Sequence, residues 1–222
     1  MSEQSLACGV IGLGAMGAPM ARRLARAGLL RGVWNRTPSR AQAVAADTGV
    51  AIAESPAALA RQCQLVLLSV SADADVEQVI ELLLPGAHAE LVVVDTSTVA
   101  VDSARRAAAR LAERGARFLD APVSGGVEGA HDGRLAMMVG GDAAVVESAR
   151  PALAALSARI VHMGPVGNGQ AAKAVNQLMA AGIIQAVSEA LAFGAAMKLP
   201  MDKLIDAISQ GAAGSWFLTH RG

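Results

Sequence analysis

Short apolar runs alternate with alanine-rich segments up to residue 162, and this alternation limits the folds that the chain can adopt. Such alternation is typical of a sheet that is covered by helices on both faces. The expected strands are residues 8–12, 32–35, 65–70, 91–95, 117–120, 135–139 and 159–162, and the expected helices are residues 16–27, 40–47, 56–61, 74–83, 101–114 and 143–156. The pattern predicts an α/β fold with a doubly wound, mostly parallel sheet.

The alternation stops at Gly164-Pro165-Val166-Gly167, which is a natural domain boundary. Beyond it no strand is indicated, and one helix of about 30 residues, roughly 45 Å long, is expected to run to Lys198. Pro200 is suited to open the next helix at residues 201–209. We therefore expect a first domain at residues 1–164 and the start of an all-helical domain at residues 165–222.

Composition excludes several classes of partner. The 222 residues carry 19 basic and 19 acidic side chains, so no charge excess points to DNA or to an anionic membrane. With no tyrosine, three Phe and two Trp, stacking platforms for single-stranded nucleic acid are not expected. The chain is 53% hydrophobic and 17% charged, which favours a well-buried core and a buried face between subunits.

The cysteines, histidines and N-terminus indicate a cytoplasmic protein without a metal. Cys8 and Cys63 lie in apolar runs without ligand spacing, and the histidines are scattered. The polar N-terminus does not read as a signal peptide. The apolar stretch at residues 164–197 is long enough to cross a bilayer, but Lys173, Glu189 and other polar residues inside it count against a membrane span.

A glycine-rich loop joins the first expected strand to the first expected helix. Gly12, Gly14 and Gly17 form a G-x-G-x-x-G pattern in the context that dinucleotide binding requires. Gly12 permits the tight turn, Gly14 permits approach of a pyrophosphate, and Gly17 permits close packing of helix and strand. The loop predicts a Rossmann-type nucleotide site; the plainer interpretation is an ordinary turn. The expected cofactor contacts in the loop are Gly12, Leu13, Gly14, Ala15, Met16 and Gly17.

The end of the second expected strand bears on the choice of nucleotide. A carboxylate here would bind the ribose of NAD, but this chain has Asn35, which carries no charge to repel a 2′-phosphate. Arg36 and Thr37 are placed to contact that phosphate, although a solvated surface arginine is the plainer interpretation of Arg36. The pattern favours NADP(H) over NAD(H).

The next two strand ends carry small polar residues. Ligands of open α/β sheets bind outside the carboxyl ends of the strands, which places Leu68, Ser69, Val70 and Thr96 near the nicotinamide half of the nucleotide. The alternative is that the hydroxyl residues among them cap the helices that follow.

Lys173 stands in a long apolar stretch whose only other charge is Glu189. An ammonium in such a helix is costly unless it has partners or a task. Asn176 and Gln177 follow at i+3 and i+4, so a helix places all three residues on one face. We interpret this face as a site, with a helix-surface lysine as the alternative.

The fifth expected strand is followed by Ser124, Gly125 and Gly126. Their hydroxyl and backbone N–H groups could bind a carboxylate, but a purely structural turn explains the pattern equally well. Four motifs in order, at residues 12–17, 120–126, 138–141 and 169–177, resemble the β-hydroxyacid dehydrogenase family, whose members include 3-hydroxyisobutyrate dehydrogenase and semialdehyde reductases. The resemblance covers essentially the whole chain.

The resemblance implies interconversion of a small 3-hydroxy acid and its semialdehyde with NAD(P). It further implies that Lys173 is the catalytic acid and base, that Asn176 orients substrate and lysine, and that Ser124, Gly125 and Gly126 hold the substrate carboxylate, with Gln177 beside them. Hydride transfer to an aldehyde creates an alkoxide that an ammonium can protonate.

Family members continue beyond residue 222, so we expect a C-terminally truncated chain with incompletely covered apolar helix faces that form a dimer or tetramer. Two other classes of protein remain alternatives. The first is a non-catalytic NADP-binding or interaction protein. The second is an imine reductase, against which Lys173 argues; 6-phosphogluconate dehydrogenase needs a much larger helical domain.

Overall fold

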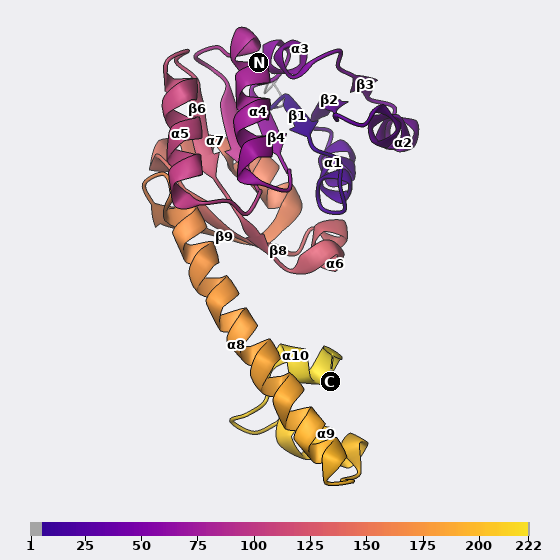
Figure 1. Cartoon of the computed structure of the whole chain (residues 1–222). Helices are drawn as coiled ribbons and strands as arrows, with labels where there is room; N and C mark the ends of the chain where they lie inside the picture. Colours follow the sequence, from indigo (N-terminus) through magenta and orange to yellow (C-terminus); the bar gives the residue numbers. More distant parts are fainter. Residues whose placement is uncertain (1–5, 222) are drawn as a thin grey trace. The chain divides into compact units, whose positions relative to one another are not determined.

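The computed structural model describes residues 6–221 and divides into two compact units, Met1–Lys173 and Ala174–Gly222. The first unit is a twisted sheet with helices on both faces (Figure 1). This confirms the predicted α/β fold with a doubly wound, mostly parallel sheet.

The sheet runs in the order β3-β2-β1-β4-β5-β6-β8-β7, with β9 paired to β8. Neighbours from β3 to β6 are parallel, whereas β8 is antiparallel to β6 and β7 and parallel to β9. The chain starts in the middle of the sheet, moves outward to β3 and returns through β4, so β1 and β4 flank the reversal point where such sheets bind ligands. The strands are β1 (Cys8–Ile11), β2 (Leu30–Trp34), β3 (Ala51–Ile52), β4 (Leu65–Leu68), β5 (Val92–Asp95), β6 (Arg117–Asp120), β7 (Val123–Ser124), β8 (Leu135–Gly140) and β9 (Ser157–Gly164).

Two apolar cores lie on opposite faces of the sheet, because successive residues of a strand point to opposite sides. Val10 and Leu67 belong to the core under α1, α2, α6 and α7, whereas Ile11 and Leu68 belong to the core under α3, α4 and α5. The central strands are buried on both faces, which explains why their sequences are uniformly apolar. The helices are α1 (Gly17–Arg26), α2 (Pro38–Thr48), α3 (Pro56–Arg61), α4 (Asp73–Leu83), α5 (Val101–Ala112), α6 (Gly126–Asp132) and α7 (Ala143–Leu156).

Three short elements depart from the sequence expectation. β3 has two residues, both exposed, and therefore lacks the apolar signal of a buried strand. β7 and α6 arise from the glycine-rich stretch after Pro122, where a loop was expected. There Gly125 and Gly126 both have positive φ, at 124° and 65°, which turns the chain sharply from β7 into α6.

The second unit is helical. α8 (Asn168–Ala196) begins in the first unit and continues into the second, where α9 (Met201–Ser209) and α10 (Trp216–Arg221) follow. A Cβ at Gly194 would lie 2.8 Å from Leu204 Cδ2, so α8 and α9 pack closely there. Several large apolar side chains of α8 are exposed, among them Leu178 and Phe193. Within residues 6–221, α8 is the one helix that is long and apolar enough to cross a membrane by length and composition.

Candidate functional site

The glycine loop forms the tight turn that the sequence predicted. Gly12 has φ +87°, and a Cβ there would lie 2.0 Å from the carbonyl oxygen of Ser69. A Cβ at Gly17 would lie 1.8 Å from the carbonyl oxygen of Gly12. Real Cβ atoms do not approach backbone this closely, so both positions require glycine. The loop thus binds β1, the start of α1 and the end of β4 into one packed unit.

The surface above Gly14 fits a dinucleotide phosphate. The nearest atom to a Cβ at Gly14 would be Arg40 Nη1, at 3.8 Å, so the backbone there is open to a ligand. Behind it, the first turn of α1 holds no acidic residue, and none of the described side chains caps its N-terminus. The N–H groups and positive end of such a helix attract an anion. Ala15 is exposed on this loop, whereas Met16 is partly buried and packs against the apolar core.

Asn35 holds the loop in shape. Its Oδ1 accepts a hydrogen bond from the Leu13 N–H at 2.7 Å, and its Nδ2 donates to the carbonyl oxygen of Thr37 at 3.0 Å. Both functional groups of the amide are therefore used within the protein. The sequence predicts Asn35 beside the nucleotide ribose. The structure adds that the Asn35 side chain holds the backbone of Leu13 in place by a hydrogen bond.

Two arginines flank the same end of the site. Arg36 Nη1 donates to Asp75 Oδ1 at 3.0 Å and to Gln78 Oε1 at 3.3 Å, so the side chain reaches toward α4. Its side chain is 71% exposed, and an ion pair this exposed contributes little to stability. The other is Arg40, whose Nη1 would lie 3.8 Å from a Cβ at Gly14 and therefore stands beside the glycine loop.

The strand ends after β4 and β5 are joined by hydrogen bonds. Thr96 is buried, and its N–H and hydroxyl both donate to the carbonyl oxygen of Leu68, at 2.8 and 2.9 Å. The N–H of Val70 donates to Ser97 Oγ at 2.9 Å. The predicted residues lie together at the carboxyl edge of the sheet. Ser97 joins them there through its bond with Val70, although the sequence did not single it out.

Ser124 ends β7, where it pairs with Ala136 of β8. Gly125 and Gly126 are exposed, and a Cβ at Gly126 would meet nothing within 4 Å. Their backbone N–H groups are thus accessible to a ligand from solvent, as an anion nest requires.

Lys173 is 7% exposed although it carries an ammonium group. Burial lowers the pKa of Lys173 below its ordinary value. Within residues 6–221 it makes no ion pair, which separates it from the paired arginines of the surface. Asn176 and Gln177 belong to the second unit, where Asn176 Nδ2 donates to Gln177 Oε1 at 3.1 Å.

Asp120 and Gln170 were not recognised as individual site residues, yet they hold the start of α8. Asp120 is fully buried at the end of β6, and its two carboxylate oxygens accept from the N–H groups of Gly167 and Gln170, at 2.8 and 2.9 Å. The signal available in the sequence was a carboxylate that ends an apolar strand.

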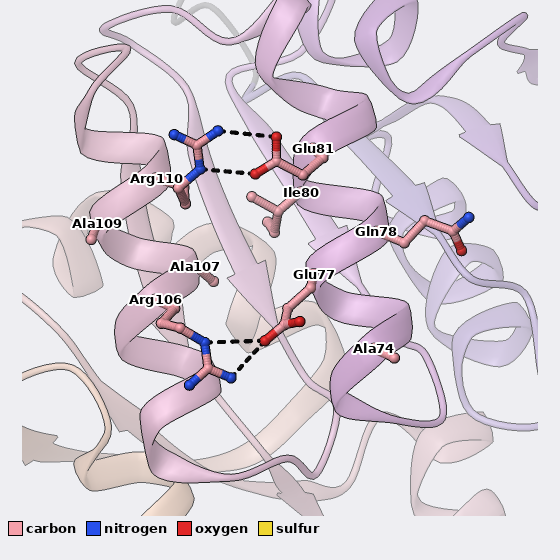
Figure 2. Close-up of a pocket in the computed structure, with 9 residues that line it drawn as sticks. All are labelled: Ala74, Glu77, Gln78, Ile80, Glu81, Arg106, Ala107, Ala109 and Arg110. Atoms are coloured by element: carbon pink, nitrogen blue, oxygen red, sulfur yellow. Dashed lines mark hydrogen bonds and ion pairs between the residues drawn. The ribbon is translucent and has the colours of Figure 1, made fainter.

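A groove on the described surface lies elsewhere, between α4 and α5 (Figure 2). It has a volume of about 570 Å³, and its charged side chains pair with one another, Arg106 with Glu77 at 2.6 Å and Arg110 with Glu81 at 2.8 Å. Because these charges neutralise each other and the strand ends lie apart from them, we assign no role to this groove.

Comparison with known proteins agrees with this geometry. The model described as the NAD binding domain of 6-phosphogluconate dehydrogenase matches residues 7–164. The model described as the NAD-binding domain of NADP-dependent 3-hydroxyisobutyrate dehydrogenase matches residues 167–222. The chain belongs to the β-hydroxyacid dehydrogenase family. Membership in the β-hydroxyacid dehydrogenase family places it among the NAD(P)-dependent oxidoreductases.

Three relatives illustrate the range of the β-hydroxyacid dehydrogenase family and its structural neighbours. An NAD-dependent L-serine dehydrogenase of Pseudomonas aeruginosa is 38% identical over 211 residues, which cover 94% of this chain and 70% of the relative. A solved 3-hydroxyisobutyrate dehydrogenase of Mycobacterium tuberculosis with L-serine has a TM-score of 0.89 at 33% identity, covering 98% of this chain and 74% of that one. An imine reductase of Streptomyces aurantiacus has a TM-score of 0.86 at 27% identity, covering 94% and 73%.

Proposed function

We propose that this chain interconverts a small 3-hydroxy acid and its semialdehyde, with NADP(H) preferred over NAD(H) and with Lys173 as the acid and base. The observation that carries the proposal is the state of Lys173, a buried ammonium with a lowered pKa and no ion pair within residues 6–221. A side chain in this state is the expected form of a proton-transfer residue. The family membership supports the same chemistry.

Lys173 would handle the proton, while a bound nicotinamide supplies or accepts the hydride. In reduction, the ammonium donates a proton to the carbonyl oxygen as negative charge develops there. In oxidation, the neutral amine takes the hydroxyl proton. A lysine with an ordinary pKa of about 10.4 is a poor base near neutrality, so the lowering caused by burial makes the second role feasible.

Ser124, Gly125 and Gly126 are proposed to hold the substrate carboxylate. A hydroxyl next to two exposed N–H groups in positive-φ conformations can surround an anion. Asn176 is proposed to orient the substrate, with Gln177 beside it. L-serine, named in the M. tuberculosis structure, carries both a carboxylate and a hydroxyl group, which is the substrate class proposed here.

The preference for NADP(H) rests on charge. Asn35 brings no carboxylate to the ribose, and Arg40 Nη1 lies near Gly14 on the phosphate side. Arg36 and Thr37 adjoin the same strand end, although Arg36 would exchange its partner Asp75 for a phosphate. The ratio of kcat/KM with NADPH to that with NADH measures this preference directly.

The decisive experiment is a substrate panel followed at the nicotinamide absorbance. It contains glyoxylate, succinic semialdehyde, tartronate semialdehyde, methylmalonate semialdehyde and one cyclic imine. Turnover of a semialdehyde supports the proposal. Turnover of the imine alone would indicate an imine reductase, and nucleotide binding without any turnover would indicate a binding protein.

Lys173→Met tests the assigned role, since it keeps the length of the side chain and removes the proton. We expect kcat to fall roughly 10²- to 10⁴-fold, while the dissociation constant of NADPH stays nearly unchanged. Lys203→Ala, an exposed lysine of α9, is the matched control and should retain wild-type kcat. Equal losses of kcat and nucleotide affinity in Lys173→Met would contradict the proton-transfer role.

We also propose that the protein is a cytoplasmic homo-oligomer, a dimer or tetramer. Residues 165–222 are proposed to form the first part of the helical domain. Apolar side chains are exposed on α8, at Leu178 and Phe193, and just after its end, at Met197. A second copy of the chain would cover this apolar surface. Burial raises the pKa of Cys8 to about 12 and that of Cys63 to about 11, which makes both thiols inert and suits a reducing compartment. A clean monomer in sedimentation velocity would contradict the oligomer.

A further inference from the structure

The first turn of α8 is attached to the sheet by one buried carboxylate. Asp120 Oδ1 accepts from the Gly167 N–H at 2.8 Å, and Asp120 Oδ2 accepts from the Gln170 N–H at 2.9 Å. These are N–H groups of the kind that a helix start leaves without intrahelical partners. Asp120 thus determines where the helix begins. One of its two partners, Gln170, lies three residues before Lys173.

Gln170 makes a second attachment with its side chain, which is 2% exposed. Its Nε2 donates to the Ser97 carbonyl oxygen at 2.8 Å, and its Oε1 accepts from the Val99 N–H at 3.2 Å. Ser97 also accepts from the Val70 N–H at its Oγ. The amide of Gln170 therefore joins the helix of Lys173 to the strand ends that face the proposed nicotinamide position.

This junction is packed without room for adjustment. A Cβ at Gly169 would lie 2.5 Å from the carbonyl oxygens of Asp120 and Met138. A Cβ at Gly140 would lie 2.4 Å from Asp120 Oδ1. Helix α8, β6 and β8 thus approach each other at backbone distance, and a shift of the helix start would require the strands to move.

We propose that Asp120 and Gln170 are positioning residues that fix the ammonium of Lys173 relative to the nucleotide-facing strand ends. Neither side chain is proposed to touch the substrate. Both act through α8, because Gln170 and Lys173 are separated by three residues and share a helix face. The inference rests on the proposed role of Lys173 and goes beyond it by naming what holds the lysine in place.

A displacement of about 1 Å in a reacting group can cost roughly 100-fold in rate. Asp120→Asn keeps the shape of the side chain but gives up the charge and one of the two acceptors. Gln170→Met keeps the length but leaves the Val99 N–H and the Ser97 carbonyl without their partner. We expect either variant to lower kcat roughly 10- to 100-fold, with the dissociation constant of NADPH within about 3-fold of wild type.

Two controls separate positioning from a general loss of stability. Asp142→Ala removes a carboxylate that accepts from the N–H groups of Ala144 and Val145 at the start of α7, a helix that carries no proposed site residue. Ser157→Ala removes a buried hydroxyl that donates to the carbonyl oxygen of Leu135 at 2.6 Å and accepts from the Arg159 N–H at 3.2 Å. Both controls should lower the melting temperature while leaving kcat unchanged.

The pH dependence of oxidation gives a readout that a structural role alone would not move. It is measured on Gln170→Met, because this substitution changes no charge. Burial lowers the pKa of Lys173, so a helix start that loosens and exposes the lysine should raise that pKa. Oxidation needs the neutral amine, and its rising limb is therefore expected at higher pH in Gln170→Met than in the wild type.

The result that overturns the inference is a wild-type kcat in both variants and an unmoved pH limb in Gln170→Met, with melting temperatures lowered as in the controls. A loss of NADPH affinity as large as the loss of kcat also overturns it, because the two residues would then serve the nucleotide edge itself. If Lys173→Met remains active, the proposed function fails first. If Lys173→Met is inactive and both positioning variants are fully active, only this inference fails.

Discussion

Asp95→Asn tests how strongly the buried strand ends depend on protonation. Asp95 ends β5 and is fully buried. Its Oδ1 accepts from the Ser97 N–H at 2.9 Å, and within residues 6–221 its Oδ2 is buried without a hydrogen-bond partner. In the register of the sheet it lies beside Asp120 of β6. A carboxylate in such surroundings is costly when charged.

The magnitude follows from the pKa. Burial, with the neighbouring Asp120 adding to it, raises the pKa of Asp95 from 3.8 to about 6, while hydrogen bonds from Ser97 oppose the rise. A raised carboxyl pKa means that the folded state binds the proton more tightly than the unfolded state. The group therefore destabilises the fold progressively as pH rises from 3.8 to 6. The full cost above pH 6 is about 3 kcal/mol, at about 1.4 kcal/mol per pKa unit.

The assay is equilibrium unfolding by denaturant at several pH values between about 4.5 and 8, on wild type and Asp95→Asn in parallel. The difference in unfolding free energy, variant minus wild type, should rise with pH by about 2 kcal/mol over this range, because part of the cost is already present at the lower limit. The slope matters more than the offset, since an amide oxygen accepts from Ser97 more weakly than a carboxylate does, and this difference shifts the whole curve.

Glu81→Gln supplies a control of opposite sign. The bond from Arg110 lowers the pKa of Glu81, so its contribution to stability is present above the ordinary pKa and is lost in acid. Removing the Glu81 carboxylate should therefore give a difference in unfolding free energy that falls as pH rises. The difference is small or flat if solvent screens the pair, because both side chains are exposed. A difference curve for Asp95→Asn that is flat or falls would refute the assignment of a costly buried charge.

Two further outcomes test the nucleotide site. Gly17→Ala places a Cβ 1.8 Å from the carbonyl oxygen of Gly12, so we expect a lower melting temperature and an NADPH affinity reduced at least 10-fold, measured by fluorescence titration; an unchanged affinity would remove the loop from the site. Asn35→Asp keeps an acceptor for the Leu13 N–H but adds a charge, so the ratio of kcat/KM with NADPH to that with NADH should fall roughly 10-fold or more. An unchanged ratio would mean that Asn35 does not adjoin the 2′-phosphate.

The sequence predicted those parts of the fold that have a periodic or compositional signal. The uniformly apolar strands, the glycine loop and the long α8 were all expected, because burial on two faces and the break at Pro200 are visible in the residues themselves. β3 is too short and too exposed to carry such a signal. Contacts across long sequence separations were also invisible, such as that of Asp120 with Gly167 and that of Asn35 with Leu13.

The site residues divide in the same way. Lys173 was noticeable because a charge in an apolar helix is unusual, and its burial is confirmed. A glutamine near a helix start has no signal of its own, so the sequence shows Gln170 only as part of a motif. The proposed role of Gln170 depends on which loop its side chain contacts. The close packing at Gly140 and Gly169 decides that contact. Sequence periodicity describes the faces of an element but not the partner that each face meets.

Hydrogen bonds join the strand ends into one connected edge. Val70 donates to Ser97, Ala121 donates to the carbonyl oxygen of Asp95 at 2.7 Å, and Gln170 donates to Ser97. The glycine loop joins the same edge through the contact of Gly12 with the Ser69 carbonyl. Because each bond fixes one strand end against the next, the distance between a nucleotide on the loop and the start of α8 is set by the sheet rather than by a flexible linker. A sheet edge built in this way fixes the start of α8, which carries the lysine proposed for proton transfer, although α8 begins at residue 168, 156 residues after Gly12.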